Sequence, residues 1–262
     1  MAKEEEILKA RILAGKEAGK KIREIYDKGF SVSYKEDSSP VTDADLASNG
    51  IIRKMLSRFS TVGWLSEESK DDLSRLNRKG VFIVDPLDGT EDFLRKDDSF
   101  SLNIAYVEEG KPVLSFIGYP AKAGYAFAAK GKGAFFVNEE GKIRRLSVSS
   151  RTKQLVRLVS KTHLLPSEEE IREKNKDRIA SSLSRGASLK GIALAKGEGD
   201  FSIRYTKHTK EWDVCARDLL VKEAGGIFLD GKGKEFSYNR EDVYNHDGYE
   251  RFNRKENRDL KR

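Results

Sequence analysis

The sequence predicts an N-terminal α+β half, residues 1–148, and a C-terminal α/β half, residues 149–262. Two observations predict this division. Before residue 148, segments with helical periodicity precede a series of strands that are separated by short turns. After it, short apolar segments alternate with helical ones. The length of 262 residues suits one large domain or two coupled ones, with room for a sizeable core.

The N-terminal half is predicted to begin with a helix over residues 4–28. Its apolar residues and two glycines recur at alternating four- and three-residue steps, which place them on one stripe of the helix. The stripe consists of Leu8, Ile12, Gly15, Gly19, Ile22 and Tyr26. Because glycine carries no side chain, we expect another element to approach this helix closely.

A turn at residues 38–42 leads into a second predicted helix. Thr42 and Asp45 form a capping pair at its start. The apolar positions of this helix are Ile51, Met55, Leu56 and Phe59. A buried strand is predicted at residues 81–84, and it is expected to end at Asp85-Pro86.

Two hairpins are expected next, one around Glu109-Gly110 and one around a Lys-Gly turn. Their strands are residues 102–107, 113–119, 124–129 and 134–137.

In the C-terminal half, strands and helices are predicted to alternate. Residues 167–170, which begin with a serine, are expected to cap a polar helix, and Gly225-Gly226 is expected to close the last helix. The predicted strands are residues 155–159, 201–204 and, as the final strand, 227–229; the other helices are residues 187–196 and 214–224. The charged segment 251–262 is interpreted as a solvated tail.

The composition excludes several classes of protein. No apolar run approaches the roughly 18–20 residues that a membrane span needs, and the first residues lack a signal-peptide pattern. The single cysteine, Cys215, excludes a disulfide framework within the chain and a cysteine-rich zinc site, and we expect it to be a small buried residue. The net charge of +7 suggests anionic ligands, but basic and acidic residues are interleaved, so nucleic acid is not an expected partner. We expect a cytoplasmic protein with no membrane partner.

The segment DPLDGT at residues 85–90 is the most informative in the chain. An apolar strand delivers two carboxylates, Asp85 and Asp88, on a turn that proline makes rigid. These carboxylates and the Leu87 carbonyl are oxygen ligands of the kind that Mg²⁺ prefers. Gly89 permits a close approach of the backbone, and the amides after it can open a helix that receives a phosphate.

Each acidic segment also has an ordinary structural interpretation when it is taken alone. An Asp-x-x-Asp-Gly sequence is a common turn former. Glu67-Glu68 fits a solvated loop, Asp213 fits a helix N-cap, and residues 42–45 fit a helix start. It is the occurrence of all of these segments in one order that indicates a metal-dependent site.

In that order the segments resemble the inositol-monophosphatase-like family of Mg²⁺-dependent, lithium-sensitive phosphatases. The resemblance rests on SSPVTDAD (38–45), SEES (66–69), VDPLDGTEDF (84–93) and WDVCARDLLVKEAGG (212–226). Within the family, SLNIA (101–105), GASLK (186–190) and HTKEWD (208–213) are most similar to the 3'(2'),5'-bisphosphate nucleotidase branch. Asp92 departs from both branches, which have Glu or Asn there, and the region after Gly226 lacks the usual Asn-Pro element.

The resemblance implies two or three Mg²⁺ ions in the site. Glu67, Asp85 and the Leu87 carbonyl would hold one ion, and Asp85, Asp88 and Asp213 would hold a second. Asp85 would bridge the two. Without cations, so many converging carboxylates would repel one another strongly.

The resemblance also implies roles in catalysis and substrate binding. Thr90, together with Asp45 and Glu67, would orient and deprotonate the attacking water. Asp88, Asp213 and the amides of Gly89 and Thr90 would contact the phosphate. Ser160, Ser188, Lys190 and Arg204 are candidates for the rest of the substrate by position only, and the two cations also fit surface charges.

The resemblance implies a layered sugar-phosphatase-type fold, with a helix pair and a largely antiparallel sheet in the N-terminal half. The expected activity is Mg²⁺-dependent hydrolysis of 3'-phosphoadenosine 5'-phosphate to AMP and phosphate, with inhibition by Li⁺. Alternatives are an inositol monophosphatase or fructose-1,6-bisphosphatase of the same fold and, outside enzymes, a basic interaction module. A small phosphorylated nucleotide is the expected partner, and a homodimer is possible.

Overall fold

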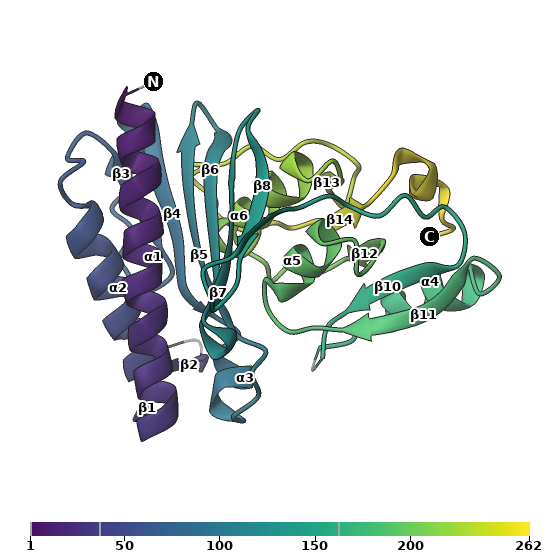
Figure 1. Cartoon of the computed structure of the whole chain (residues 1–262), viewed down its shortest axis with the longest axis horizontal. Coiled ribbons are helices and arrows are strands. Elements are labelled where there is room, and N and C mark those ends of the chain that lie inside the picture. The colour runs from purple at the N-terminus through teal and green to yellow at the C-terminus, as the bar shows by residue number, and fades with distance from the viewer. Residues whose placement is uncertain (1, 37, 162) are drawn as a thin grey trace.

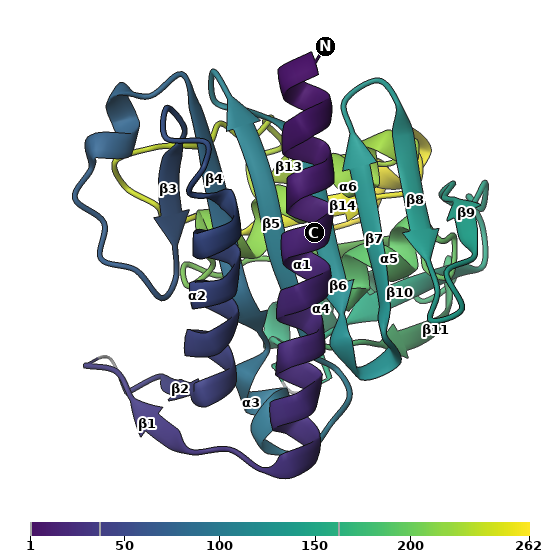
Figure 2. The ribbon, with the colours of Figure 1, turned by 60° about the vertical axis from the view of Figure 1, so that its left-hand side comes forward.

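A computed structural model describes residues 2–36, 38–161 and 163–262 of the chain. Within them, α1 and α2 form an outer layer, followed by a seven-stranded sheet, the helices α5 and α6, and a five-stranded sheet (Figures 1 and 2). The predicted layered architecture of helices and sheets is confirmed. No helix in the described part of the chain is both long and apolar enough to cross a membrane.

The seven-stranded sheet contains strands from the N-terminal half alone. Its order is β3-β4-β5-β6-β7-β8-β9, and every pair is antiparallel except β3 with β4. The strands are β3 (Gly63–Ser66), β4 (Gly80–Asp88), β5 (Ser101–Glu108), β6 (Lys111–Tyr119), β7 (Gly124–Ala129), β8 (Gly133–Val137) and β9 (Ile143–Arg145). Both predicted hairpins are confirmed, and positive φ angles at Glu109 and Gly110 make the first turn tight.

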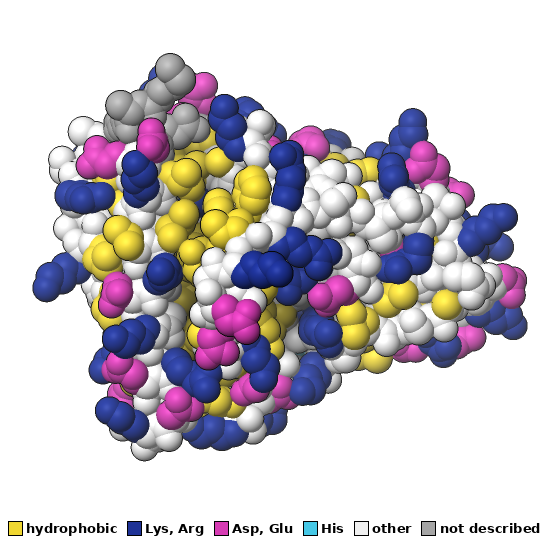
Figure 3. Space-filling model, in the orientation of Figure 1, with side chains coloured by type: hydrophobic (Ala, Val, Ile, Leu, Met, Phe, Trp, Pro, Cys, Tyr) yellow, Lys and Arg dark blue, Asp and Glu magenta, His cyan; other side chains and the backbone are white. Residues whose placement is uncertain are grey.

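Helices α1 (Ala2–Lys28) and α2 (Asp43–Leu56) pack together on one face of this sheet. The buried stripe of α1 is rotated relative to the predicted one, since Leu8 and Ile12 are only half-buried. Its buried apolar residues are Ile7, Ala10, Ala14, Ala18, Ile22 and Tyr26. The predicted close approach is confirmed at Gly15, where a Cβ would overlap the Phe116 ring of β6. An apolar groove of about 270 Å³ runs beside the helix there, within the yellow band to the right of α1 in Figure 3.

The five-stranded sheet lies wholly in the C-terminal half, with the order β11-β10-β12-β14-β13. Its strands are β10 (Leu155–Val159), β11 (Ile179–Ser184), β12 (Phe201–Arg204), β13 (Ile227–Asp230) and β14 (Tyr249–Phe252). The helices that follow the first sheet are α4 (Pro166–Lys174), α5 (Leu189–Ala195) and α6 (Glu211–Glu223). The remaining short elements are β1 (Val32–Tyr34), β2 (Pro40–Thr42), α3 (Thr90–Leu94) and the 3₁₀ helices Ser74–Asn77, Pro120–Lys122 and Lys255–Asp259.

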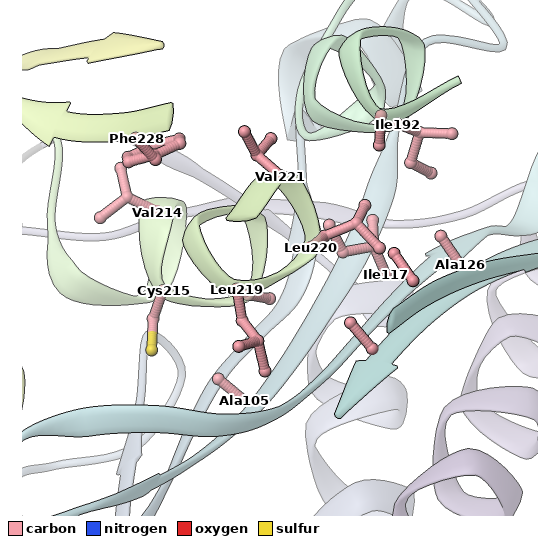
Figure 4. Packing of buried hydrophobic residues seen from close by; sticks show 14 of the residues in the cluster. Ala105, Ile117, Ala126, Ile192, Val214, Cys215, Leu219, Leu220, Val221 and Phe228 are labelled. Atoms are coloured by element: carbon pink, nitrogen blue, oxygen red, sulfur yellow. The ribbon is translucent and has the colours of Figure 1, made fainter. Parts of the chain in front are cut away.

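Helix α6 joins the two sheets in one core. Figure 4 shows Cys215 and Leu219 directed toward Ala105 of β5, while Val214 faces Phe228 of β13. Cys215 is fully buried, as predicted. Burial of apolar side chains on both sides of α6 therefore fixes its first turn relative to β4, and that first turn carries Asp213.

The charged C-terminal segment is not a solvated tail, and residues 227–229 do not form the final strand. Residues 249–252 form β14 between β12 and β13, with antiparallel pairing on both sides. Arg251, Phe252, Asn253, Asn257 and Leu260 are buried. Asn253 Nδ2 donates to the Ser149 and Arg151 carbonyls, so long-range polar contacts hold a segment whose composition resembles an exposed one.

Two element boundaries also differ from the predictions. Strand β4 continues past Asp85-Pro86 to Asp88, because a register shift between Asp85 and Asp88 lets the ladder with β5 resume at Ser101. Helix α4 begins at Pro166 with Leu165 as its N-cap, so Ser167 is not the cap; proline is favoured at the first helical position.

Candidate metal centre

The parallel pairing of β3 and β4 brings two acidic segments to the same sheet edge. Ser66 is in register with Val84, and the Glu67 amide donates to the Val84 carbonyl at 3.2 Å. Glu67 therefore lies beside Val84 of β4, next to Asp85, which is 1% exposed. Because the carboxyl ends of parallel neighbours meet at one edge, the two segments converge although 18 residues separate them.

The first turn of α6 brings a further carboxylate to this edge. Carboxylate oxygens of Asp85, Asp88 and Asp213 all lie within 4.8 Å of one another. Asp213 is not the N-cap of α6, since the helix begins at Glu211; its carboxylate accepts from the Lys210 amide at 2.6 Å. Three carboxylates from two distant segments thus surround one point.

The electrostatics of this cluster fit a divalent cation. Burial raises the pKa of Asp85 well above its ordinary value, and the neighbouring Asp88, Glu67 and Asp213 carboxylates raise it further. Burial and the Asp88 and Glu67 carboxylates raise the pKa of Asp213 to about 7. Buried like charges are costly without a counterion, and oxygen-only donors are those that hard cations prefer. The residues present therefore fit a bound metal ion.

Asp88 is fixed by three donors from two other elements. Ser101 Oγ and Asn103 Nδ2 of β5 donate to its Oδ2 at 3.3 and 3.2 Å, and Ser188 Oγ donates to the same atom at 2.5 Å. Ser188 is fully buried and contacts the cluster through Asp88. These hydrogen bonds orient one carboxylate and leave its other oxygen, Oδ1, for a cation or substrate.

Thr90 is linked to a second buried carboxylate beside the cluster. Its Oγ1 lies 3.1 Å from Asp45 Oδ1 and 3.2 Å from the Leu87 carbonyl. Asp45 is 1% exposed, and its Oδ2 accepts from the amide and hydroxyl of Thr42 in the predicted capping box. Burial raises the pKa of Asp45, although hydrogen bonds from Thr42 and Thr90 oppose the rise. The Asp45 carboxylate, itself oriented by Thr42, thus holds the Thr90 hydroxyl beside the cluster.

Lys35, between β1 and β2, is a site residue that the sequence analysis missed. Its Nζ lies 3.2 Å from Glu67 Oε1 and 2.6 Å from Glu68 Oε1. Its ammonium group supplies a positive charge to Glu67, the first residue after β3. A lone lysine in a polar turn carries no sequence signal of this kind.

One cavity of about 380 Å³ joins the carboxylate cluster to a basic region. Its lining includes Glu67, Asp88, Gly89, Thr90, Asp213, Ser160, Lys190 and Arg204, all of which the sequence analysis named. Lys190 is only 5% exposed and its Nζ donates to the Arg185 carbonyl, whereas Arg204 pairs with Glu168 at 3.0 Å. Neither cation is an ordinary surface charge.

Arg217 and Tyr249 also line this cavity, and the sequence analysis named neither. Arg217 follows Asp213 by four residues on α6, so helical spacing puts both on one face of the helix. The sequence alone could therefore have indicated that Arg217 lies near the site. Tyr249 lies on β14, and its role could not be found without that strand.

We expect the metal-free protein to become more stable as pH falls from about 8 to 5. The pKa of Asp213 is about 7 when folded, against an ordinary value of 3.8, so the folded chain holds a proton that the unfolded chain has released. That stability is present at low pH and is lost as pH rises through about 7.

Asp213→Asn removes this charge, so it should raise the melting temperature of the metal-free protein at pH 8 and flatten its pH dependence. Each kcal/mol gained corresponds to about 2–4 °C in a domain of 150–250 residues. Scanning calorimetry in a chelator measures the effect, with the exposed Asp177→Asn as the matched control. An Asp213→Asn protein no more stable than the wild type at pH 8 would contradict the expectation.

Comparison with known proteins identifies clear relatives. The Inositol monophosphatase family profile matches residues 3–259. The 3'(2'),5'-bisphosphate nucleotidase CysQ of Salmonella typhimurium is 30% identical over 236 residues, which cover 88% of this chain and 94% of that protein. The CysQ of Haemophilus influenzae is 31% identical, covering 91% of this chain and 90% of that protein. The crystal structure of CysQ from Bacteroides thetaiotaomicron superposes with a TM-score of 0.81 and 30% identity, over 95% of this chain and 97% of that one.

Proposed function

The chain belongs to the inositol monophosphatase family, and we propose that it is a Mg²⁺-dependent 3'(2'),5'-bisphosphate nucleotidase. The expected reaction converts 3'-phosphoadenosine 5'-phosphate to AMP and phosphate. The proposal rests on one cavity whose lining contains two carboxylates of the cluster, Asp88 and Asp213, and the cations Lys190 and Arg204. The similarity to the CysQ nucleotidases supports the same conclusion. The cytoplasmic location and the homodimer stay predictions of the sequence.

Two or three Mg²⁺ ions are proposed to bind the carboxylate cluster. Glu67, Asp85 and the Leu87 carbonyl would hold one ion, and Asp85, Asp88 and Asp213 would hold another. When bound, such ions neutralise the phosphoryl oxygens and stabilise the leaving oxygen. The raised pKa values of Asp85 and Asp213 support this assignment, because burial and neighbouring carboxylates make both negative charges costly in the absence of a cation.

Thr90 and Asp45 are proposed to prepare the attacking water, with Glu67 beside them. The Thr90 hydroxyl donates its proton to a hydrogen bond with Asp45. The lone pairs of the Thr90 oxygen therefore remain free to accept a hydrogen bond from water. A proton removed from that water can then pass through Thr90 to Asp45, whose pKa burial raises toward the range of a useful base. The Gly89 and Thr90 amides at the start of α3 are proposed to receive the phosphate; Gly89 has φ = +94° and closely faces Ala187.

Lys190 and Arg204 are proposed to bind the phosphate group that is not hydrolysed. Lys190→Met should raise KM for 3'-phosphoadenosine 5'-phosphate by about 10- to 100-fold, because it removes a charge-assisted hydrogen bond in a desolvated pocket. Its effect on KM for inositol 1-phosphate should be much smaller. Steady-state kinetics on the two substrates measure the difference. Equal losses on both would assign Lys190 a structural role.

A substrate panel with Mg²⁺ tests the proposed function directly. We expect kcat/KM to be highest for 3'-phosphoadenosine 5'-phosphate, ahead of inositol 1-phosphate and fructose 1,6-bisphosphate. A preference for either sugar phosphate would favour the other members of the family, and an inert protein would favour a basic interaction module. Inhibition by Li⁺ at limiting Mg²⁺ is expected from the family, and its absence would indicate a different metal arrangement.

A further inference from the structure

Arg217 is a buried cation that lines the cavity without a hydrogen bond or ion pair among the described residues. It is 4% exposed, lines the cavity, and its Nε has no hydrogen-bond partner. Across residues 2–36, 38–161 and 163–262, no hydrogen bond or ion pair includes this side chain. An unpaired buried guanidinium is costly to a folded protein, so an anionic partner from outside the chain would be favourable.

The surrounding structure holds Arg217 in this place. Its guanidinium lies over the Tyr249 ring, 5.4 Å from the centroid, and the Arg251 guanidinium lies 5.1 Å from the same centroid. Arg251 is fully buried. Gly191 of α5 provides the space, since a Cβ there would come within 3.0 Å of Arg217 Cγ. The side chain is therefore packed between α5 and β14 and is not free to leave the cavity.

The anionic groups near Arg217 are those that the metal ions would neutralise. Burial lowers the pKa of Arg217, but Tyr249 and the Asp88, Asp213 and Asp85 carboxylates raise it above its ordinary value. Glu168, which also lies in this region, is already paired with Arg204 at 3.0 Å. Divalent cations bound to these carboxylates would neutralise them. The positive charge of Arg217 would then lack their compensation at the wall of the cavity.

We propose that Arg217 is a specificity-determining residue that binds the phosphate of the substrate that is not hydrolysed. This inference rests on the proposed nucleotidase function and adds a third cation to the cavity lining that already includes Lys190 and Arg204. Four residues separate Arg217 from Asp213, which is about 6 Å along the helix axis. Arg217 lines the same cavity as Lys190 and Arg204, so a ligand that occupies this cavity can place a second anionic group against it.

Arg217→Met tests the proposal with two substrates that differ only in the distal phosphate. KM for adenosine 3',5'-bisphosphate should rise about 10- to 100-fold, as expected for loss of a hydrogen bond between charged groups, and KM for adenosine 3'-phosphate should rise less than about threefold. Binding of AMP, which keeps only the distal phosphate, should weaken by a similar factor in calorimetry. This second measurement does not depend on turnover.

Three further variants separate this role from a structural one. Arg217→Gln should behave like Arg217→Met, and Arg217→Lys should recover part of the preference for the bisphosphate. Arg75→Met, which removes a buried arginine that pairs with Asp71 outside the cavity, is the matched control and should not change the preference. Thermal unfolding establishes that each variant is folded.

The outcomes distinguish this inference from the proposed function. Equal losses on both substrates, or unchanged AMP binding in Arg217→Met and Arg217→Gln, would overturn the role of Arg217 while the wild type still prefers the bisphosphate. A wild type that prefers inositol 1-phosphate would instead overturn the proposed function. In that case AMP binding by wild type and Arg217→Met still decides whether Arg217 binds a phosphate.

Discussion

Asp85→Asn is expected to reduce kcat for phosphate monoester hydrolysis by about 10³-fold or more while the protein stays folded. Asp85 belongs to both sets of proposed metal ligands, and its buried carboxylate lies near those of Asp88 and Asp213. Removing one preorganised donor to a transition state commonly costs about 10²–10³-fold, and Asp85 would serve both cations. Because the substitution also relieves repulsion among carboxylates, the metal-free variant should be at least as stable as the wild type.

Kinetics at increasing Mg²⁺ and thermal unfolding in a chelator measure the two effects of Asp85→Asn. Asp218→Asn is the matched control, because Asp218 is an equally buried carboxylate that contacts Tyr238 and Lys222 outside the cavity. Its kcat should stay within about threefold of the wild type. Full turnover in Asp85→Asn at the Mg²⁺ concentration that saturates the wild type would overturn the two-metal assignment.

Asp45→Asn should lower kcat by about 10²–10⁴-fold and change KM little, which is the range of general-base catalysis. The substitution keeps the size of the side chain, but it removes the carboxylate that accepts from the Thr90 hydroxyl at 3.1 Å. Thr90→Ala should cause a loss of similar size. Because the two groups act on one proton, the double variant should lose little more than either single variant.

Steady-state and single-turnover kinetics of the three variants measure this coupling. Asp43→Asn is the matched control, since Asp43 is also in the first turn of α2 but is exposed and accepts from the Ser31 amide. Additive losses in the double variant would show that Thr90 and Asp45 act separately. A kcat within tenfold of the wild type for Asp45→Asn would exclude it as the base.

Much of the fold was predictable because it depends on local patterns. Helical periodicity predicted α1 and α2, and alternation with turn residues predicted β5 to β8. The DPLDGT segment, residues 85–90, indicated an acidic site because a strand, a rigid turn and two carboxylates occur within six residues. The capping pair Thr42 and Asp45 was predicted for the same reason, and the structure shows both of its hydrogen bonds. Such features can be predicted from the sequence because the residues that form them are close together in the chain.

The tertiary structure decided what depends on partners far away in the chain. Residues 251–262 look like an exposed basic tail, yet the first two of them belong to β14, a buried strand that pairs with β12 and β13. Lys35 reaches Glu67 across 32 residues, and Ser188 reaches Asp88 across 100. Helical spacing puts Arg217 on the same face of α6 as Asp213, but only the folded chain shows that it lines the cavity and packs against Tyr249 of β14. By itself, the sequence determined the chemical groups of the site and their local geometry. Packing between the two sheets decided which charges face one another, because burial and Coulomb interactions depend on distance in space and not on distance along the chain.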